Sequence, residues 1–359
     1  MAKESGKSER HSRQARGTVA AASSAAGQVV TLEMVAAAAQ VSPSTVSRIL
    51  NGTAKVSADK KAAVDKAIAR LGFRPNPVAR GLAGGRTLSI GVITQAIDSP
   101  FYGEGLRGIE DELGAAGYIP LFVSGHWDAA DEQKCIDVLL SRRVDGVIMF
   151  TGRLADKALL AVANTVPMVV TGRQLKAPRI VNLNFDNVEG ARLATNHLIE
   201  QGHRRIVHIS GDLAHADAVE RQQGYKLALK QAKLPFDPAL VVPGDFHESS
   251  GLRAVDHLIA TRQDFSAIFT ANDQMAYGAA LGLYRRHLRV PDDVSIVGFD
   301  DLHGSQFSIP PLTTVRQPVY ELGCLSARAM LDLLRGVQPQ VALPPPQLVN
   351  RESTRSVRA

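Results

Sequence analysis

The sequence has few cysteines, few aromatic residues and no long apolar run. Cys135 and Cys324 are the two cysteines among 359 residues, which is too few for a disulfide framework and is typical of a reducing cytoplasm. No apolar stretch approaches the about 20 residues that a membrane-spanning helix needs. Hydrophobic residues make up 45% of the chain and charged residues 21%, as in ordinary globular domains. We therefore expect a cytoplasmic protein that does not enter a membrane.

Sequence patterns typical of enzymes are also missing. The chain has no Walker A loop, no G-x-S-x-G pattern and no H-E-x-x-H pattern. His247 and His257 are ten residues apart with no cysteine near them, and His203 directly precedes a predicted strand, so we expect these histidines to be structural. The sequence thus predicts a protein that is not an enzyme, has no cofactor and has no metal site.

Positive charge is concentrated at the N-terminal end. Residues 1–86 contain 14 Lys and Arg against 5 Asp and Glu, whereas the net charge of the whole chain is +6. The rest of the chain is therefore slightly acidic. Residues 1–28 are basic but contain no Leu, Ile or Phe, so they are a poor signal peptide and are expected to form a disordered basic arm. A basic end favours contact with the phosphate backbone of nucleic acid.

Residues 31–72 are predicted to form three short helices. Thr31 can cap the first helix, Ser42 and Pro43 are typical of an N-cap and a first helical position, and Ser57 can cap a third helix that Gly72 ends. The second helix, 43–50, leaves four polar side chains facing outward: Ser44, Thr45, Ser47 and Arg48. An arginine there can bond guanine bidentately, and the hydroxyls can reach phosphates or base edges. A DNA-binding helix-turn-helix is predicted, with a three-helix interaction module as the alternative.

The motif V-S-P-S-T-V-S-R-I-L-N-G at 41–52, followed by V-S at 56–57 and L-G-F-R-P-N at 71–76, resembles the lactose/galactose-repressor family of bacterial transcription regulators. The resemblance runs from about residue 30 to 355. It departs at Gln40, where the family usually has glycine in the turn. We expect a positive φ and some backbone strain at this residue.

The resemblance gives the segment N-P-V-A-R-G-L-A at 76–83 a role. In the family, a short hinge helix folds on specific DNA, pairs with its dimer mate and inserts a leucine into the minor groove, and Leu82 matches that leucine. An apolar wedge of this kind unstacks a base step and kinks the duplex. The residues predicted to contact DNA are Thr31, Ser42, Pro43, Ser44, Thr45, Ser47, Arg48, Asn51, Asn76, Val78, Ala79 and Leu82.

From residue 88 onward, predicted strands and helices alternate in two cycles. Strands are predicted over 89–94, 119–124, 146–150, 168–171, 206–211, 267–272 and 295–299. Strand–helix alternation favours parallel sheets. Two such cycles suggest two lobes with a cleft between them. The family fold that the resemblance implies agrees: two lobes like those of periplasmic sugar-binding proteins, linked by crossovers near residues 187, 317 and 344. The predicted fold class is an all-α helix-turn-helix domain followed by an α/β body of two lobes. The predicted domains, with lobe bounds that the resemblance implies, are the arm 1–28, the helix-turn-helix domain 29–75, the hinge 76–86, lobe 1 at 87–187 and 318–343, and lobe 2 at 188–317 and 344–359.

Ligands of open α/β sheets bind at the carboxyl ends of the strands, so the residues that follow each strand are candidates for an effector site. Aromatic, charged and amide side chains gather there: Phe101, Tyr102, Arg173, Asp217, Arg221, Phe246, Asn272, Asp300 and Gln317. This set suits a sugar, whose hydroxyls bond planar polar groups and whose C–H face packs on an aromatic ring. Each residue also has a structural alternative; Asn272, for example, can cap the helix that follows it.

The resemblance also bears on the ligand class. Purine-responsive members of the family place a tryptophan near the position of Arg173, whereas Trp127, the single tryptophan here, lies elsewhere in the sequence; this favours a carbohydrate. The segment L-V-N-R-E-S-T at 348–354 resembles the family's closing strand, and no leucine heptads follow it. Family members with a tetramerising coil carry such heptads, so a homodimer is expected. The predicted function is a repressor that binds a palindromic, double-stranded operator. The alternatives are an exported sugar-binding protein, a sugar-active enzyme, and a regulator whose co-effector is a phosphocarrier protein.

Overall fold

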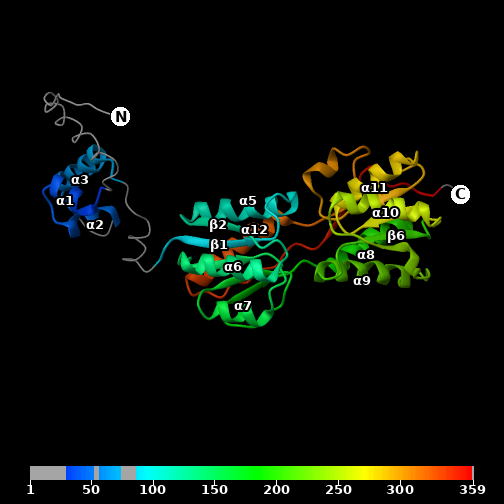
Figure 1. Ribbon diagram of the computed structural model, residues 1–359, viewed down its shortest axis with the longest axis horizontal. Coiled ribbons are helices and arrows are strands. Elements are labelled where there is room, and N and C mark those ends of the chain that lie inside the picture. Colours follow the sequence, from blue (N-terminus) through cyan, green and yellow to red (C-terminus); the bar gives the residue numbers. More distant parts are fainter. Residues whose placement is uncertain (1–29, 52–55, 74–85, 358–359) are drawn as a thin grey trace, which may run out of the picture. The chain divides into compact units, whose positions relative to one another are not determined.

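The computed structural model describes residues 30–51, 56–73 and 86–357, and the chain divides into two compact units, 1–85 and 86–359 (Figure 1). We call them the head and the body. The predicted hinge residues Asn76, Val78, Ala79 and Leu82 lie outside the described residues, as does the arm 1–28. No helix in the described part of the chain is long and apolar enough to cross a membrane.

The head contains three helices: α1 (Leu32–Ala38), α2 (Pro43–Asn51) and α3 (Ala58–Leu71). Val35, Val46 and Val64, one from each helix, are fully buried together in its core. Thr31 caps α1, since its hydroxyl accepts a hydrogen bond from the backbone N–H of Met34. Each short helix therefore depends on its cap and on packing against the other two.

Two turns of the head test the sequence predictions directly. Gln40 has φ 55°, so the positive φ expected at this departure from the family pattern is confirmed. Gly72 ends α3 in the left-handed conformation, also as predicted. Ser57 occupies the N-cap position of α3, but its side chain accepts no capping hydrogen bond there. The prediction for Ser57 is therefore correct about the N-cap position and wrong about the capping hydrogen bond.

The first lobe of the body is a five-stranded parallel sheet in the order β2-β1-β3-β4-β5. Its strands are β1 (Ser89–Thr94), β2 (Ile119–Ser124), β3 (Gly146–Met149), β4 (Met168–Thr171) and β5 (Ile180–Leu183). The helices are α5 (Pro100–Ala115), α6 (Ala129–Ser141), α7 (Asp156–Ala163) and the later α12 (Val319–Leu334). Helices α5 and α12 cover one face of the sheet, and α6 and α7 cover the other.

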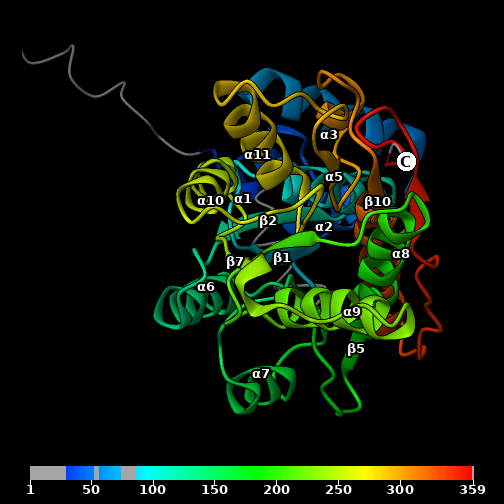
Figure 2. The same ribbon diagram turned by 90° about the vertical axis from the view of Figure 1, so that its right-hand side faces the viewer.

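The second lobe repeats this plan with a four-stranded parallel sheet in the order β7-β6-β8-β9. Its strands are β6 (Ile206–Ser210), β7 (Val241–Pro243), β8 (Ala267–Thr270) and β9 (Ser295–Val297). The helices are α8 (Asn187–Glu200), α9 (Ala216–Gln231), α10 (Glu248–Ala260) and α11 (Asp273–Arg285). Helices α8 and α9 lie together on one face, with α10 and α11 on the other (Figures 1 and 2).

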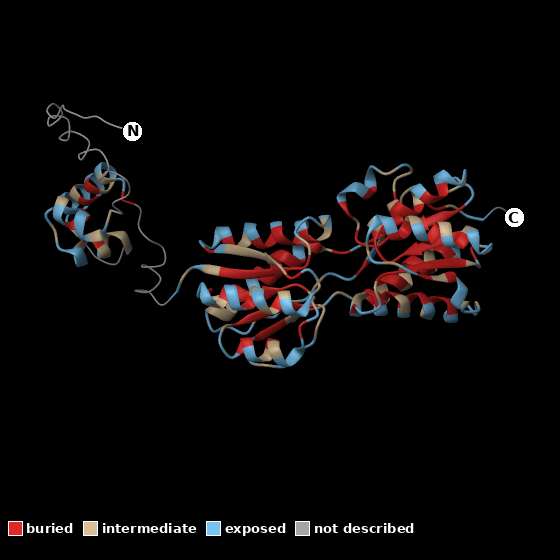
Figure 3. Ribbon diagram, viewed as in Figure 1, coloured by how far each residue is buried: buried red, intermediate tan, exposed pale blue. Residues whose placement is uncertain are grey.

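The body also contains a two-stranded antiparallel ribbon. It pairs β10 (Thr314–Arg316), which precedes α12 in the sequence, with β11 (Gln347–Val349), which follows α12. Figure 3 shows that the sheet strands are buried while the helices expose their outer faces. Helices therefore cover both faces of each parallel sheet. The ends of the strands remain as the positions where polar side chains can lie together.

Candidate functional site

The nine predicted effector residues follow strands of both lobes or the ribbon. Phe101 and Tyr102 begin α5 after β1, and Arg173 follows β4. In the second lobe the predicted residues follow β6, β7, β8 and β9 in turn: Asp217 and Arg221 in α9, then Phe246, Asn272 and Asp300. Gln317 directly follows β10.

Four of the nine predicted residues line one cavity of about 40 Å³ that residues of both lobes enclose. They are Phe101, Tyr102, Asp217 and Gln317, and Phe150, Thr171, Phe185 and Asn187 are among the other lining residues. The rings of Phe101 and Phe150 pack edge-on against Tyr102, at centroid distances of 5.2 and 5.7 Å. The lining therefore combines a cluster of aromatic rings with polar side chains.

A buried charged group lies beside this cavity. The guanidinium of Arg221 is 4% exposed, lies 4.0 Å from the ring centroid of Phe299 and donates from Nε to Oδ1 of Asn187 at 2.9 Å. Its Nη1 is 3.8 Å from the carboxylate of Asp300, which also accepts a 2.7 Å hydrogen bond from Nε2 of Gln317. Arg221, Asp300 and Gln317, predicted as one group, are thus brought into contact.

Burial changes the pKa of two groups at this site. It raises the pKa of the Asp300 carboxyl to about 8, although Arg221 acts in the opposite direction. Burial, reinforced by the negative charge of Asp217, also raises the pKa of the Tyr102 phenol well above its usual range. Tyr102 therefore remains a neutral hydroxyl that can donate and accept hydrogen bonds.

Backbone strain accompanies these residues. Phe246 has φ 67° and Asp300 has φ 121°, conformations that cost a non-glycine residue on the order of 1–3 kcal/mol. The ring of Phe246 packs over Gly211, where an added Cβ would lie 2.0 Å from the ring. Strain held by surrounding structure clusters at functional sites, so these conformations support the predicted site.

Two predicted residues make mainly structural contacts. Asn272 caps α11, because its Oδ1 accepts from the Met275 N–H at 3.0 Å while its Nδ2 donates to the carbonyl of Phe246 at 2.8 Å. The structural alternative for Asn272 is therefore realised. Arg173 is held within the first lobe by the carbonyls of Gly152 and Leu154 and by Asp156. It lines, with Asp217, an adjoining cavity of about 430 Å³ that shares Asn187 and Asp217 with the first.

Several residues near the site were not predicted. Asn187, at the start of α8, binds Arg221 and also donates to Glu220 at 3.0 Å. Trp127, which was not among the predicted site residues, has its ring centroid 6.5 Å from that of Tyr102 and stacks on His215 at 3.8 Å. No local signal could have shown the contact, because its partners are far apart in the sequence.

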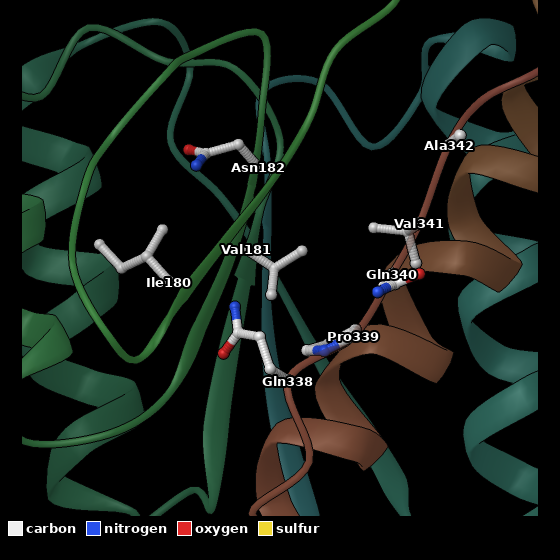
Figure 4. Close-up of a pocket in the computed structure, with 8 residues that line it drawn as sticks. All are labelled: Ile180, Val181, Asn182, Gln338, Pro339, Gln340, Val341 and Ala342. Atoms are coloured by element: carbon white, nitrogen blue, oxygen red, sulfur yellow. The ribbon is translucent and has the colours of Figure 1, made fainter.

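A wider cavity of about 640 Å³ lies at the outer strand of the first lobe, between β5 and the segment 338–342 (Figure 4). It is lined by Ile180, Val181, Asn182, Gln338, Pro339, Gln340, Val341 and Ala342. None of the nine predicted residues lines it, so size alone does not identify the effector site.

The head presents the predicted DNA-reading face on α2. Ser42, Pro43, Ser44 and Arg48 are exposed, whereas Thr45 and Ser47 are half-buried. The Ser42 hydroxyl lies 2.9 Å from that of Ser44 and 2.8 Å from that of Thr45, and it accepts from the Thr45 N–H at 3.2 Å. The hydroxyls at the N-terminus of α2 are thus fixed by one another. The side chain of Asn51 is not among those described.

A three-helix head and a two-lobed body with polar strand ends define a class of DNA-binding regulators controlled through the body. Family models agree: residues 31–76 match the bacterial regulatory proteins of the lacI family, and residues 195–354 match a periplasmic binding protein-like domain. The HTH-type transcriptional repressor PurR of Haemophilus influenzae is 35% identical over 338 residues, which cover 92% of this chain and 100% of the relative.

Two solved structures are similar over most of the chain. A lac repressor dimer bound to operator and the anti-inducer ONPF has a TM-score of 0.84 at 32% identity, covering 92% of this chain and 100% of that one. A transcriptional regulator CelR–cellobiose complex has a TM-score of 0.68 at 34% identity, covering 90% and 99%. The chain belongs to the lacI family of bacterial regulatory proteins. It is a DNA-binding transcription regulator, which confirms the predicted fold class and function over the exported sugar-binding alternative.

Proposed function

We propose that this chain is a homodimeric repressor that binds a palindromic operator and is controlled by a carbohydrate in the cavity between its lobes. The observation that carries the proposal is that Tyr102 of one lobe and Asp217 of the other line the same cavity, beside the buried Arg221–Asp300 pair. The similar lac repressor structure is a dimer on its operator. We further propose that the protein acts in the cytoplasm by binding alone, with no catalytic step.

On the DNA side, Pro43, Ser44 and Arg48 are proposed to contact base edges, because they are exposed on the N-terminal half of α2. Ser42, Thr45, Ser47, Thr31 and Asn51 are proposed to support backbone contacts. The proposed hinge contacts are Asn76, Val78, Ala79 and Leu82, with Leu82 as the minor-groove wedge. The Arg48 side chain can read a guanine bidentately, so it is the proposed main source of base preference.

On the effector side, the chemistry of the wall residues favours a sugar. A ring wall formed by Phe101 and Tyr102 suits the C–H face of a pyranose, and Asn187, Asp217 and Gln317 offer partners for its hydroxyls. A cellobiose complex of a similar regulator supports this class of ligand.

The cavity volume indicates how control works. Ligand sites usually exceed about 300 Å³, whereas the cavity here holds about 40 Å³. An effector that fills this cavity therefore needs the lobes to separate. It must also bind the separated and closed arrangements with unequal affinity, since a ligand that binds both equally changes nothing.

The test is selection of genomic DNA fragments by the purified protein, repeated with each of a panel of mono- and disaccharides. Enrichment of one short palindrome that one sugar removes would support the full proposal. A palindrome that every sugar leaves unchanged would overturn the carbohydrate assignment and favour another effector, including a phosphocarrier protein. Absence of any palindrome would overturn the operator assignment.

The Leu82→Ala variant tests the hinge within the same selection. Unstacking a base step costs a few kcal/mol, which the additional contacts of the kinked DNA offset. Without the wedge the duplex is not kinked and these contacts are lost, so binding to the selected palindrome should weaken by roughly tenfold or more. Binding to random DNA should stay within about twofold because it depends on phosphate contacts. Equal weakening on both DNAs would contradict the wedge role.

A further inference from the structure

Side chains from the two lobes meet at a second place, outside the cavity wall. Trp127 and Arg153 come from the loops after β2 and β3 of the first lobe, and Asp212 and His215 come from the loop after β6 of the second. The indole of Trp127 stacks on the imidazole of His215 at a centroid distance of 3.8 Å and an interplanar angle of 28°. Nη2 of Arg153 lies 2.8 Å from Oδ2 of Asp212 and 3.3 Å from Nε2 of His215.

The first-lobe half of this contact is held by buried polar groups. Oε1 of Gln95 accepts a hydrogen bond from the backbone N–H of Trp127 at 2.9 Å. The Glu132 carboxylate accepts the backbone N–H groups of Arg153, at 2.8 Å, and of Leu154, at 2.6 Å. Gln95 and Glu132 are both fully buried. Trp127 also has φ 55°, a conformation that the surrounding structure must maintain.

Glycines bring these two loops close to the buried carboxylate. An added Cβ on Gly125 or Gly152 would lie 2.6 or 2.5 Å from a Glu132 side-chain atom. The carboxylate thus sits between the loop that carries Trp127 and the loop that carries Arg153. Glu132 therefore packs against both loops, while Gln95 holds the backbone of Trp127.

The second-lobe half connects directly to the proposed effector site. Oδ1 of Asp212 accepts the Ala214 N–H at 2.9 Å, and the Asp212 carbonyl accepts the His215 N–H at 2.9 Å, which fixes the loop. His215 is the N-cap residue of α9, the helix that carries Asp217 and Arg221. A movement that separates His215 from Trp127 consequently moves the start of the helix that holds the effector groups.

We propose that Trp127, Arg153, Asp212 and His215 form an interlobe latch that holds the two lobes closed and sets how readily the cavity opens. The regulatory consequence rests on the proposed function, because the cavity must open for an effector to enter. The closing contact itself needs neither effector nor DNA. Gln95 and Glu132 act as positioning residues for the first-lobe half of the latch.

The latch can be measured through its own tryptophan, the single tryptophan of the chain. In the full-length protein without ligand, Trp127 should be partly shielded from acrylamide by His215. Arg153→Gln removes the ion pair, and His215→Ala removes the stacked ring. Each variant should increase the open fraction roughly 2- to 10-fold, as expected for loss of one aromatic or ionic contact, with a higher quenching constant and red-shifted emission.

The matched control is Arg286→Gln. Arg286 pairs with Asp256 at 2.9 Å with exposure similar to that of the Arg153–Asp212 pair, but both partners lie in the second lobe. This variant should leave the emission and quenching of Trp127 unchanged. Circular dichroism confirms that each variant is folded, and Asp212→Asn provides a second break of the ion pair if Arg153→Gln does not fold.

The outcomes separate the latch from the proposed function. Unchanged quenching in folded Arg153→Gln, Asp212→Asn and His215→Ala would overturn the latch, whatever the response to sugars. Increased quenching in these variants, with no sugar that alters operator binding by the parent protein, would support the latch and overturn the carbohydrate assignment. An equal change in Arg286→Gln would also overturn the latch, since that pair does not join the lobes.

Discussion

His208 shows how a single buried side chain makes stability depend on pH. Its imidazole is fully buried between the rings of Tyr225 and Phe269, at centroid distances of 5.1 and 4.9 Å. Its Nδ1 lies 3.1 Å from the carbonyl of Phe269. Burial lowers the pKa of His208 from 6.5 to about 4. The folded protein therefore keeps this ring neutral in a pH range where the unfolded chain protonates it.

The first prediction concerns the free energy of unfolding between pH 6.5 and 4. The unfolded chain binds one more proton than the folded state in this window, so the contribution of His208 to stability falls as the pH falls. At about 1.36 kcal/mol per pKa unit, the loss by pH 4 is about 3 kcal/mol. Urea unfolding of His208→Phe, which keeps a stacked ring, should show a correspondingly smaller loss between pH 7 and 4.5. Parallel pH profiles for parent and variant would contradict this assignment.

Arg221 carries the second prediction. Its planar guanidinium reaches Asn187 and the carbonyl of Ala271 at once, which a lysine cannot do. Arg221→Lys should weaken the response to the active sugar by roughly 10- to 100-fold, because hydrogen bonds to a buried charge contribute about 1.5–3 kcal/mol. Operator binding without sugar should stay unchanged in a fluorescence-anisotropy titration. Arg286→Lys is the control, and an unchanged sugar response in Arg221→Lys would remove this residue from the site.

Sequence reasoning succeeded at residues whose role is local. The positive φ of Gln40 was expected because the family usually has glycine at that turn position, and the alternative role of Asn272 as a helix cap followed from its position before α11. It failed for Trp127 and His215, because a stacked pair 88 residues apart has no local signature. Sheet geometry predicts that the effector side chains lie together at the strand ends. Contacts between two loops of different lobes depend instead on tertiary packing.

At the scale of elements, close helix packing depends on particular glycines. Helix α5 packs against α12 across Gly108 and Gly323. An added Cβ at Gly108 would lie 2.2 Å from the carbonyl oxygen of Tyr320, and one at Gly323 would lie 2.1 Å from that of Gly105. The obstacles are backbone atoms, which cannot move without shifting a whole helix. This pair therefore joins the C-terminal helix to the first lobe.

The third prediction compares three alanine substitutions in α5. Gly103 and Gly114 have open space where a Cβ would be, so Gly103→Ala and Gly114→Ala should stabilise by up to about 1 kcal/mol through helix propensity. Gly108→Ala should instead destabilise by about 1–3 kcal/mol, as expected for overpacking. The measurement is the free energy of unfolding in urea. A stabilised Gly108→Ala would show that α5 and α12 do not pack this closely in solution.

Element prediction from the sequence was uneven for physical reasons. Strands β1, β3 and β4 of the first lobe were predicted at nearly their observed bounds, because they are apolar runs buried on both faces. Strands β5, β7 and β10 and helices α10 and α12 were not predicted. The three strands have only three or four residues each, and β10 pairs in the antiparallel ribbon rather than in a parallel sheet. Strand β11 lies at the start of the closing strand that the resemblance implied.

At the scale of the whole molecule, the head and the body differ in both charge and fold. The N-terminal 86 residues have 14 basic against 5 acidic residues, whereas the whole chain is only +6. The alternation of strands and helices predicted the two-lobed body, and the helix-turn-helix spacing predicted the head, so the predicted fold class is confirmed. The cavity size and the latch could not be predicted, since both depend on how closely the two lobes approach each other in the folded chain.

The last prediction separates base reading from charge. Arg48 is exposed on α2, which suits a bidentate contact to one guanine in each half-site. Arg48→Ala should relax the base preference at that one position by about 1–3 kcal/mol, measured by repeating the DNA selection with the variant. Each lost phosphate contact lowers the salt slope by about one, whereas a base contact changes sequence preference. A uniform loss over all sequences with a reduced salt slope would therefore reassign Arg48 to the phosphate backbone and leave base reading to Pro43 and Ser44.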